Sequence, residues 1–133
     1  QSGTKQIRLT NRSSDKAQAI ADEFGAAITV VPWAHRHSAL ADCATVINTT
    51  SQGMYGQTAL DVNLDHLSAH TLVADAIYVP LETPFLAAAR ARGNQTVNGL
   101  GMLLNQARPA FNAWFGVMPS ITPELLNAVH ATF

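Results

Sequence analysis

The stretch that decides the fold is residues 44–54, ATVINTTSQGM. Its first five residues are apolar on both faces, which is typical of a strand buried in a parallel sheet. Residues 49–56 follow as a polar loop that contains Gly53 and Gly56. In open α/β sheets, ligands bind in the crevice outside the carboxyl ends of the strands. The stretch therefore predicts a buried strand with a candidate ligand site at its end, although an ordinary connecting loop explains the same residues.

Short apolar runs alternate with helical patterns on both sides of this stretch. Further strands are expected at residues 5–10, 27–31, 72–77 and 95–97. Helices are expected at residues 14–24, 35–41, 82–92 and 99–115, and after the capping residue Thr122. This alternation predicts an α/β fold with a parallel sheet.

The first and the longest helix carry patterns that the structure can test. Ser13 or Ser14 is expected to cap the first helix. Pro109 lies inside the longest helix and predicts a kink or a local break. Two sets of residues have the spacing of an apolar helix face: Ala17, Ile20, Ala21 and Phe24 in the first helix, and Leu100, Leu103, Leu104, Ala107, Phe111 and Trp114 in the longest.

Composition excludes several classes of protein. The 133 residues suit one domain, and the 47% hydrophobic content supports a packed core. A net charge of −1 gives no electrostatic footprint for nucleic acid. No apolar run approaches the roughly 20 residues of a membrane span. The single cysteine, Cys43, excludes an internal disulfide framework and suits a reducing, cytoplasmic setting.

The turn after the first strand is a candidate phosphate site. In dinucleotide-binding βαβ units, an acid at the strand end bonds the ribose 2′-hydroxyl of NAD, whereas an arginine accommodates the 2′-phosphate of NADP. Residues 10–13 contain no acid, and Arg12 can form a bidentate fork to phosphate. Ser13 and Lys16 can add donors. A capped turn with a solvated arginine is the simpler interpretation of these residues taken alone.

Two later segments also follow strands. Tyr78 comes after the strand at 72–77 with Pro80 behind it, and alone it is better explained as structural. Gly99 and Gly101 open the longest helix, where they permit either close approach of a ligand or close helix–sheet packing. Met102 and Gln106 lie four residues apart and share one side of that helix. No metal site is expected, since His35 and His37 lack further ligands nearby in the sequence.

Four motifs together resemble one family. They are Asn11-Arg12-Ser13, Asn48-x-Thr50-x-x-Gly53-Met54, Asp75-x-x-Tyr78-x-Pro80-x-x-Thr83-Pro84, and GLGMLxxQAxxAFxxW from Gly99 to Trp114. Their order resembles the C-terminal half of shikimate dehydrogenase over residues 6–116. The first motif is unspecific, because glutamyl-tRNA reductases have similar turns. The last two motifs joined together are specific.

The resemblance implies NADP-dependent reduction of 3-dehydroshikimate to shikimate, on the pathway to chorismate and aromatic amino acids. By position, Asn11, Arg12 and Ser13 would hold the 2′-phosphate end of NADP, and Lys16 is added from its charge alone. The other implied cofactor-binding positions are Thr49, Thr50 and Ser51 in the cleft, and Ala76, Gly99 and Met102 near the nicotinamide. Tyr78 and Gln106 would reach towards the hydroxyls or carboxylate of the substrate.

The chain also departs from the family pattern. Asn98 stands where the family usually has Asp. No Gly-x-Gly-x-x-Gly/Ala loop precedes the first strand, and the family's substrate domain, with its catalytic lysine and aspartate, is not in the sequence. The expectation is therefore one partial domain over residues 1–133, with a Rossmann-like three-layer parallel sheet, helices on both faces, and no first βα unit. Such a chain would hold no catalytic residues and would be inactive alone.

Two alternatives stay open at this point. The parent protein could act on quinate with NAD, although Arg12 in place of an acid argues against NAD. The chain could also be a non-catalytic α/β module that binds a nucleotide or a partner. An exposed sheet edge would then invite a homodimer or edge-strand pairing. Neither nucleic acid nor a membrane is an expected partner.

Overall fold

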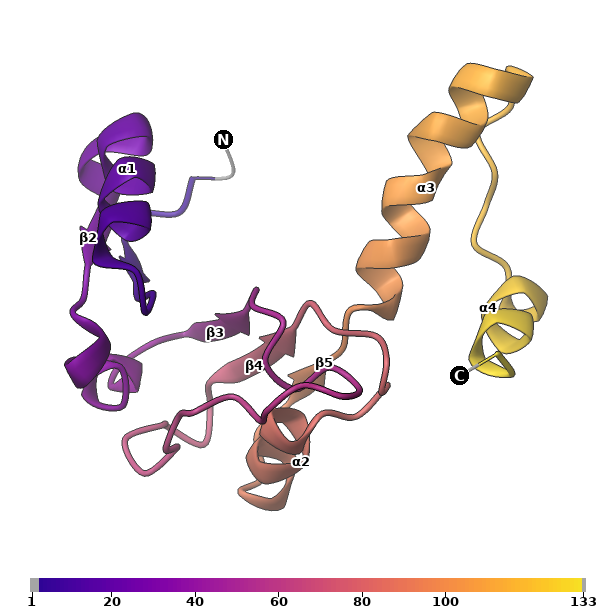
Figure 1. Ribbon diagram of the computed structural model, residues 1–133. Helices are drawn as coiled ribbons and strands as arrows, with labels where there is room; N and C mark the ends of the chain where they lie inside the picture. Colours follow the sequence, from indigo (N-terminus) through magenta and orange to yellow (C-terminus); the bar gives the residue numbers. More distant parts are fainter. Residues whose placement is uncertain (1–2, 133) are drawn as a thin grey trace. The chain divides into compact units, whose positions relative to one another are not determined.

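The computed structural model describes residues 3–132, which form two compact units (Figure 1). Residues 3–43 and 62–68 form the first unit, and residues 44–61 and 69–132 form the second. Each unit contains its own parallel sheet. The α/β class expected from the sequence is confirmed.

The first unit is built on one strand–helix–strand segment. Strand β1 (Ile7–Leu9) pairs in parallel with β2 (Ile28–Val30), and Ile7 lies opposite Ile28. Helix α1 (Ser14–Phe24) connects them, followed by the short 3₁₀ turn η1 (Gly25–Ala27). Only the small residues of the predicted apolar face are buried, Ala17 and Ala21, while Phe24 is 66% exposed.

The prediction of a helix at residues 35–41 is wrong. The chain forms two 3₁₀ turns there, η2 (Trp33–His35) and η3 (Ser38–Leu40). Arg36 donates from Nη1 to the Trp33 carbonyl oxygen at 3.0 Å, and Ser38 Oγ donates to the His35 carbonyl oxygen at 3.0 Å. Such side-chain bonds to nearby carbonyls compete with the hydrogen bonds of a regular helix.

The second unit carries a three-stranded parallel sheet in the order β3-β4-β5. The strands are β3 (Thr45–Asn48), β4 (Leu72–Asp75) and β5 (Thr96–Val97). Helix α2 (Pro84–Ala91) connects β4 to β5 and buries Leu86 and Ala89. Strand β4 ends two residues earlier than predicted, because the Asp75 carboxylate accepts a hydrogen bond from the Ile77 N–H and turns the chain.

Strand β3 is not buried on both faces, so the prediction of a fully buried strand at residues 44–48 is wrong. The Ile47 side chain is 60% exposed. Strand β3 is an edge of its sheet, and its unit does not cover the face that carries Ile47. The apolar run at 44–48 identified the strand correctly but not its surroundings.

The chain ends in two further helices, α3 (Leu100–Phe115) and α4 (Pro123–His130). Helix α3 continues across Pro109, so of the predicted kink or local break the break is wrong and the kink stays a prediction. Its apolar stripe is buried at Leu100 but exposed at Trp114, where 77% of the side chain is accessible. Thr122 caps α4 as expected, accepting a hydrogen bond from the Leu125 N–H at 3.2 Å. Among the described residues, no helix combines the length and apolar character needed to cross a membrane.

Candidate functional site

The loop after β3 is shaped by one buried side chain. Asn48 is 4% exposed, and its Oδ1 accepts hydrogen bonds from the Thr50 N–H at 3.0 Å and the Thr50 hydroxyl at 2.8 Å. The Thr50 oxygen in turn accepts from the Gln52 N–H at 3.1 Å. Turns of this kind let short polar side chains replace backbone partners. The result is a tightly wound loop at the carboxyl end of the sheet.

The turn after β4 is fixed by Asp75, which is 2% exposed. Its Oδ1 accepts from Asn48 Nδ2 at 3.1 Å and from the Ile77 N–H at 3.1 Å. Its Oδ2 accepts from the Thr83 hydroxyl at 2.8 Å. Asp75 therefore joins the ends of β3 and β4 to the start of α2. The motifs contain Asp75 but do not mark it as a site residue.

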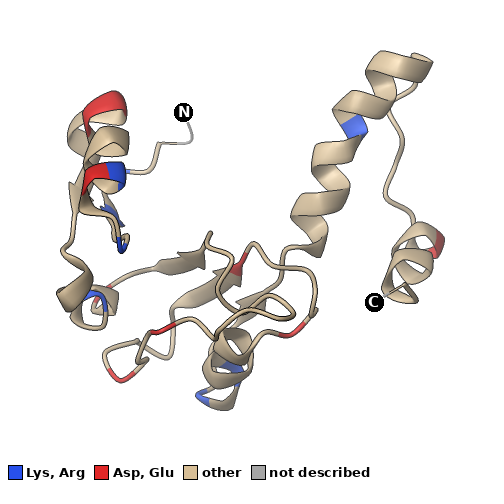
Figure 2. Ribbon diagram, in the orientation of Figure 1, with Lys and Arg blue, Asp and Glu red and all other residues tan. Residues whose placement is uncertain are grey.

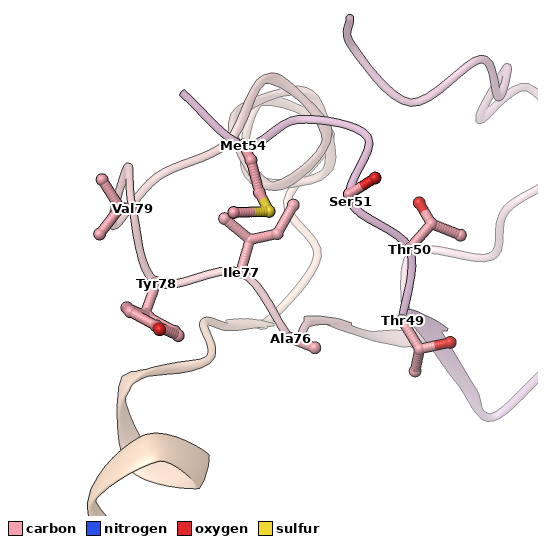
Figure 3. A pocket seen from close by; sticks show the side chains of 8 residues that line it. All are labelled: Thr49, Thr50, Ser51, Met54, Ala76, Ile77, Tyr78 and Val79. Carbon is pink, nitrogen blue, oxygen red and sulfur yellow. The ribbon is translucent and has the colours of Figure 1, made fainter. Parts of the chain in front are cut away.

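A hollow of about 340 Å³ lies between the loop and this turn (Figure 3). The predicted residues Thr49, Thr50, Ser51, Ala76 and Tyr78 all line it. Thr50 is committed to Asn48, whereas the Thr49 and Ser51 hydroxyls have no hydrogen-bond partner within residues 3–132. Hydroxyls at the rim of such a hollow can bond a polar ligand.

A second hollow of about 330 Å³ shares Thr49 and Ala76 with the first and extends to Gly99 and Met102. A side chain at Gly99 would collide with the carbonyl group of Ala76. The Gly99 N–H also donates to the Ile77 carbonyl oxygen at 2.8 Å. The first glycine of the long helix is therefore needed for close backbone packing beside the hollow. By contrast, Gly101 has open space around it.

Asn98 links the start of α3 to the turn that contains Pro80. Its Nδ2 donates to the Leu81 carbonyl oxygen at 3.1 Å, and its Oδ1 accepts from the Leu100 N–H at 3.2 Å. An ionised aspartate has no donor for the first of these bonds. The amide therefore gives this chain a contact that an Asp at the same position would lack.

The predicted phosphate turn lies in the first unit, at the start of α1. Ser13 occupies the N-cap position but forms no side-chain capping bond, and Asn11 Oδ1 accepts from the Ser13 N–H at 3.0 Å instead. The prediction that the Ser13 hydroxyl caps α1 is therefore wrong. Arg12 and Lys16 are exposed, and neither has a hydrogen bond or ion pair within the described part of the chain. Uncapped N–H groups at a helix start, with a free guanidinium beside them, suit an anion.

Gln106 does not line either hollow. It is an exposed residue of α3, whereas Tyr78 lines the first hollow. The structure therefore does not bring the two expected substrate-binding residues into one pocket, and their shared role stays a prediction.

The second unit has little charge around the hollows (Figure 2). Residues 44–60 and 94–107 contain no Asp, Glu, Lys or Arg, which leaves Asp75 as the charged group among the pocket residues. Within residues 3–132, no group of three His, Cys, Asp or Glu side chains could hold a metal ion. His37 Nδ1 accepts from the Asn63 N–H at 2.8 Å, which gives this histidine a structural partner.

Comparisons with known proteins show which family the chain is similar to. Residues 99–123 match the family model for the shikimate 5′-dehydrogenase C-terminal domain. A shikimate dehydrogenase (NADP⁺) from Rhodopseudomonas palustris strain BisB18 is 51% identical over 129 residues, 97% of this chain and 47% of that protein. One from Acidiphilium cryptum is 53% identical over 125 residues, 94% of this chain and 45% of that protein. The chain belongs to the shikimate dehydrogenase family.

Solved structures of this family are also similar. Shikimate dehydrogenase from Thermus thermophilus in complex with NADP(H) and shikimate has a TM-score of 0.72 and 30% identity, covering 86% of this chain and 42% of that one. Quinate dehydrogenase from Corynebacterium glutamicum in complex with NAD has a TM-score of 0.81 and 29% identity, covering 89% and 44%. The expected Rossmann-like fold is confirmed. The chain spans about half the length of the curated relatives that it matches.

Proposed function

We propose that this chain is the NADP-binding half of an enzyme that reversibly reduces 3-dehydroshikimate to shikimate. The observation that carries the choice of NADP is the start of α1, where Arg12 has no partner in the described chain and no acid occupies residues 10–13. A guanidinium without a competing carboxylate favours a 2′-phosphate over a bare ribose hydroxyl.

The residues present fit the two ends of such a cofactor. Asn11, Arg12, Ser13 and Lys16 would bind the phosphate end. Thr49 and Ser51 offer hydroxyls to the cleft, and Thr50 holds the loop in shape. Ala76, Gly99 and Met102 line the second hollow, which is where we place the nicotinamide.

Bound NADPH supplies the hydride that reduces the substrate carbonyl. The chain's part is to orient the cofactor and, through Tyr78 and Gln106, the hydroxyls or carboxylate of the substrate. The proton that accompanies the hydride would come from a second domain, so we expect the chain alone to be inactive. In that proposal, residues 1–133 form one partial NADP-binding domain. We place the enzyme in the cytoplasm, which suits a single cysteine, Cys43, that forms no disulfide within residues 3–132.

Two measurements test this function separately. Calorimetric titration of the chain should show NADP binding about tenfold or more tighter than NAD, as a charge-assisted phosphate contact predicts. Equal or tighter NAD binding would favour the quinate dehydrogenase alternative. For activity, the matching 129 residues of the Rhodopseudomonas palustris enzyme can be exchanged for this chain. A folded chimera that does not reduce 3-dehydroshikimate with NADPH would refute the proposed reaction.

A second candidate is supported by the exposed Ile47 on the edge strand β3. An unpaired strand edge with an apolar side chain can add a strand from a second copy or from another protein. Sedimentation of the chain at several concentrations distinguishes the cases. A monomer at every concentration excludes pairing between copies.

A further inference from the structure

The buried carboxylate at the end of β4 has a role that the motifs do not assign. We propose that Asp75 is a positioning residue, which holds the 48–52 loop and the 76–79 turn in the shape that binds the cofactor. This inference rests on the proposed function, because that function gives the two hollows their ligand.

Two of the three bonds of Asp75 reach segments that line the first hollow, and the third reaches the start of α2. One partner is the amide of Asn48, which shapes the loop carrying Thr49 and Ser51. Another is the backbone N–H of Ile77, inside the turn that lines the first hollow. The third is the hydroxyl of Thr83, at the start of α2. All three partners donate, and a carboxylate is the side chain that can accept from all of them at once.

Asp75 also sets the direction of the bonds in the loop. Asn48 Nδ2 donates both to Asp75 and to the Gln52 carbonyl oxygen, at 3.1 and 3.0 Å. With its nitrogen held on that side, Asn48 presents its oxygen to the N–H and hydroxyl of Thr50. The carboxylate therefore orients the amide, and the amide orients the loop.

Thr83 connects Asp75 to the start of helix α2. Its single hydroxyl proton goes to Asp75, so its oxygen is left to accept from the Leu86 N–H at 3.3 Å and cap the helix. The Thr83 side chain is fully buried, and its methyl and Cβ lie against Gly53. Loop, turn and helix start thus share one acceptor.

The chain offers a matched control at the opposite end of the same sheet. Asn94 is 5% exposed and donates from Nδ2 to the Thr71 carbonyl oxygen at 2.9 Å, just before β5 and β4 begin. It lines neither hollow. Asn94→Asp breaks a buried bond as Asp75→Asn does, but it does so away from the site.

The experiment measures two quantities on the 133-residue chain: residue-resolved amide hydrogen exchange without cofactor, and the Kd for NADP. Asp75→Asn keeps the shape of the side chain but has a single accepting oxygen. It therefore cannot accept from Asn48, Ile77 and Thr83 together, and its N–H₂ group faces at least one of these donors. Thr83→Val removes the bond from Thr83 to Asp75 and the cap, whereas Thr83→Ser keeps both. Urea unfolding of every variant shows whether an effect follows from lost stability alone.

We expect Asp75→Asn and Thr83→Val to speed exchange at the amides of Thr50, Gln52 and Ile77 by about tenfold or more, as the loss of a buried partner predicts. The Kd for NADP should rise by a similar factor. Thr83→Ser should restore both values, and Asn94→Asp should leave both within about twofold while lowering stability. This pattern supports the proposal.

Other patterns overturn it. If exchange in the loop and turn is unchanged in Asp75→Asn, Asp75 does not position them, whatever happens to binding. If Asn94→Asp weakens NADP binding as much at equal loss of stability, the effect is general destabilisation. If the unaltered chain does not bind NADP, the proposed function fails, and the exchange data still decide whether Asp75 orders the loop.

Discussion

Substituting Gly99 by alanine tests whether the junction between β5 and α3 is as tightly packed as the structure indicates. The backbone of Gly99 has φ −76° and ψ −3°, which any residue adopts, so alanine introduces no conformational strain. The added Cβ would instead meet the carbonyl oxygen and carbon of Ala76. Both are backbone atoms at the end of β4, and neither can rotate away as a side chain could.

The loss of stability in Gly99→Ala can be worked out from the backbone atoms of Ala76 that must move. Overpacking typically costs about 1–3 kcal/mol, and a clash with backbone belongs at the upper end of that range or above it. Separation of the two segments would also weaken the bond from the Gly99 N–H to the Ile77 carbonyl oxygen, which adds about 1 kcal/mol. We therefore expect Gly99→Ala to lower the free energy of unfolding by about 3–4 kcal/mol.

Gly101→Ala is the matched control, two residues further along the same helix. Nothing lies within 4 Å of a Cβ built there. Gly101 is the second residue of α3, where alanine gains at most the roughly 0.5–1 kcal/mol by which it exceeds glycine in a helix interior, so this variant should be at least as stable as the unaltered chain. Urea denaturation followed by circular dichroism measures both. Equal midpoints for the two variants would refute the argument from close packing.

Three further predictions concern separate parts of the chain. Arg12→Ala should weaken NADP binding about tenfold or more and leave NAD binding unchanged in calorimetric titration, because only NADP carries the 2′-phosphate; equal effects on both cofactors would place Arg12 elsewhere. Leu86→Ala should lower the free energy of unfolding by about 2–5 kcal/mol in urea denaturation, because Leu86 is 1% exposed. Arg90→Gln is the control: it breaks an exposed ion pair with Glu82 and should change the free energy of unfolding by less than about 1 kcal/mol. A backbone hydrogen bond and the Thr122 hydroxyl hold the pKa of Glu124 below its usual 4.5, so its contribution to α4 is present above that pH and is lost as the pH falls through the lowered pKa. A carboxyl titration by NMR that gives a normal pKa for Glu124 would contradict this.

Local patterns in the sequence predicted most of the elements, because strands and helix ends are specified by neighbouring residues. Thr122 with Pro123 marked the start of α4 correctly, and Gly116 with φ 69° ends α3 as a glycine should. The turns at 33–40 were missed because the bonds of Arg36 and Ser38 to nearby carbonyls leave no trace in hydrophobic periodicity. The exposure of Ile47 was missed because burial of a strand depends on what covers it, not on its own residues.

The site likewise combines residues that local patterns predict with residues that depend on distant partners. Polar residues after apolar runs located Thr49, Ser51 and Tyr78 at the strand ends, since parallel strands end at one edge of a sheet. The third motif contains both Asp75 and Thr83 but assigns Asp75 no role, because its bonds to Thr83, 8 residues away, and to Asn48, 27 residues away, cannot be seen in the sequence. A carboxylate directly after an apolar run was the one available signal. A charged residue at that position is buried only where donors surround it.

Hydrogen bonding within the 48–52 loop explains why its three adjacent hydroxyl residues, Thr49, Thr50 and Ser51, are not equivalent. The Thr50 hydroxyl donates to Asn48 and accepts from Gln52, so its polar atom is used within the protein. Thr49 and Ser51 alternate with it along the chain, and their hydroxyls have no hydrogen-bond partner within residues 3–132, so the proposed function gives them the cofactor as their partner. A loop in which every hydroxyl faced the cleft would lack internal bonds and would have to be ordered when the ligand binds, at a cost in affinity. Because Thr50 is bonded to Asn48, which Asp75 holds, the proposed function predicts that Thr49 and Ser51 are ordered before the cofactor binds.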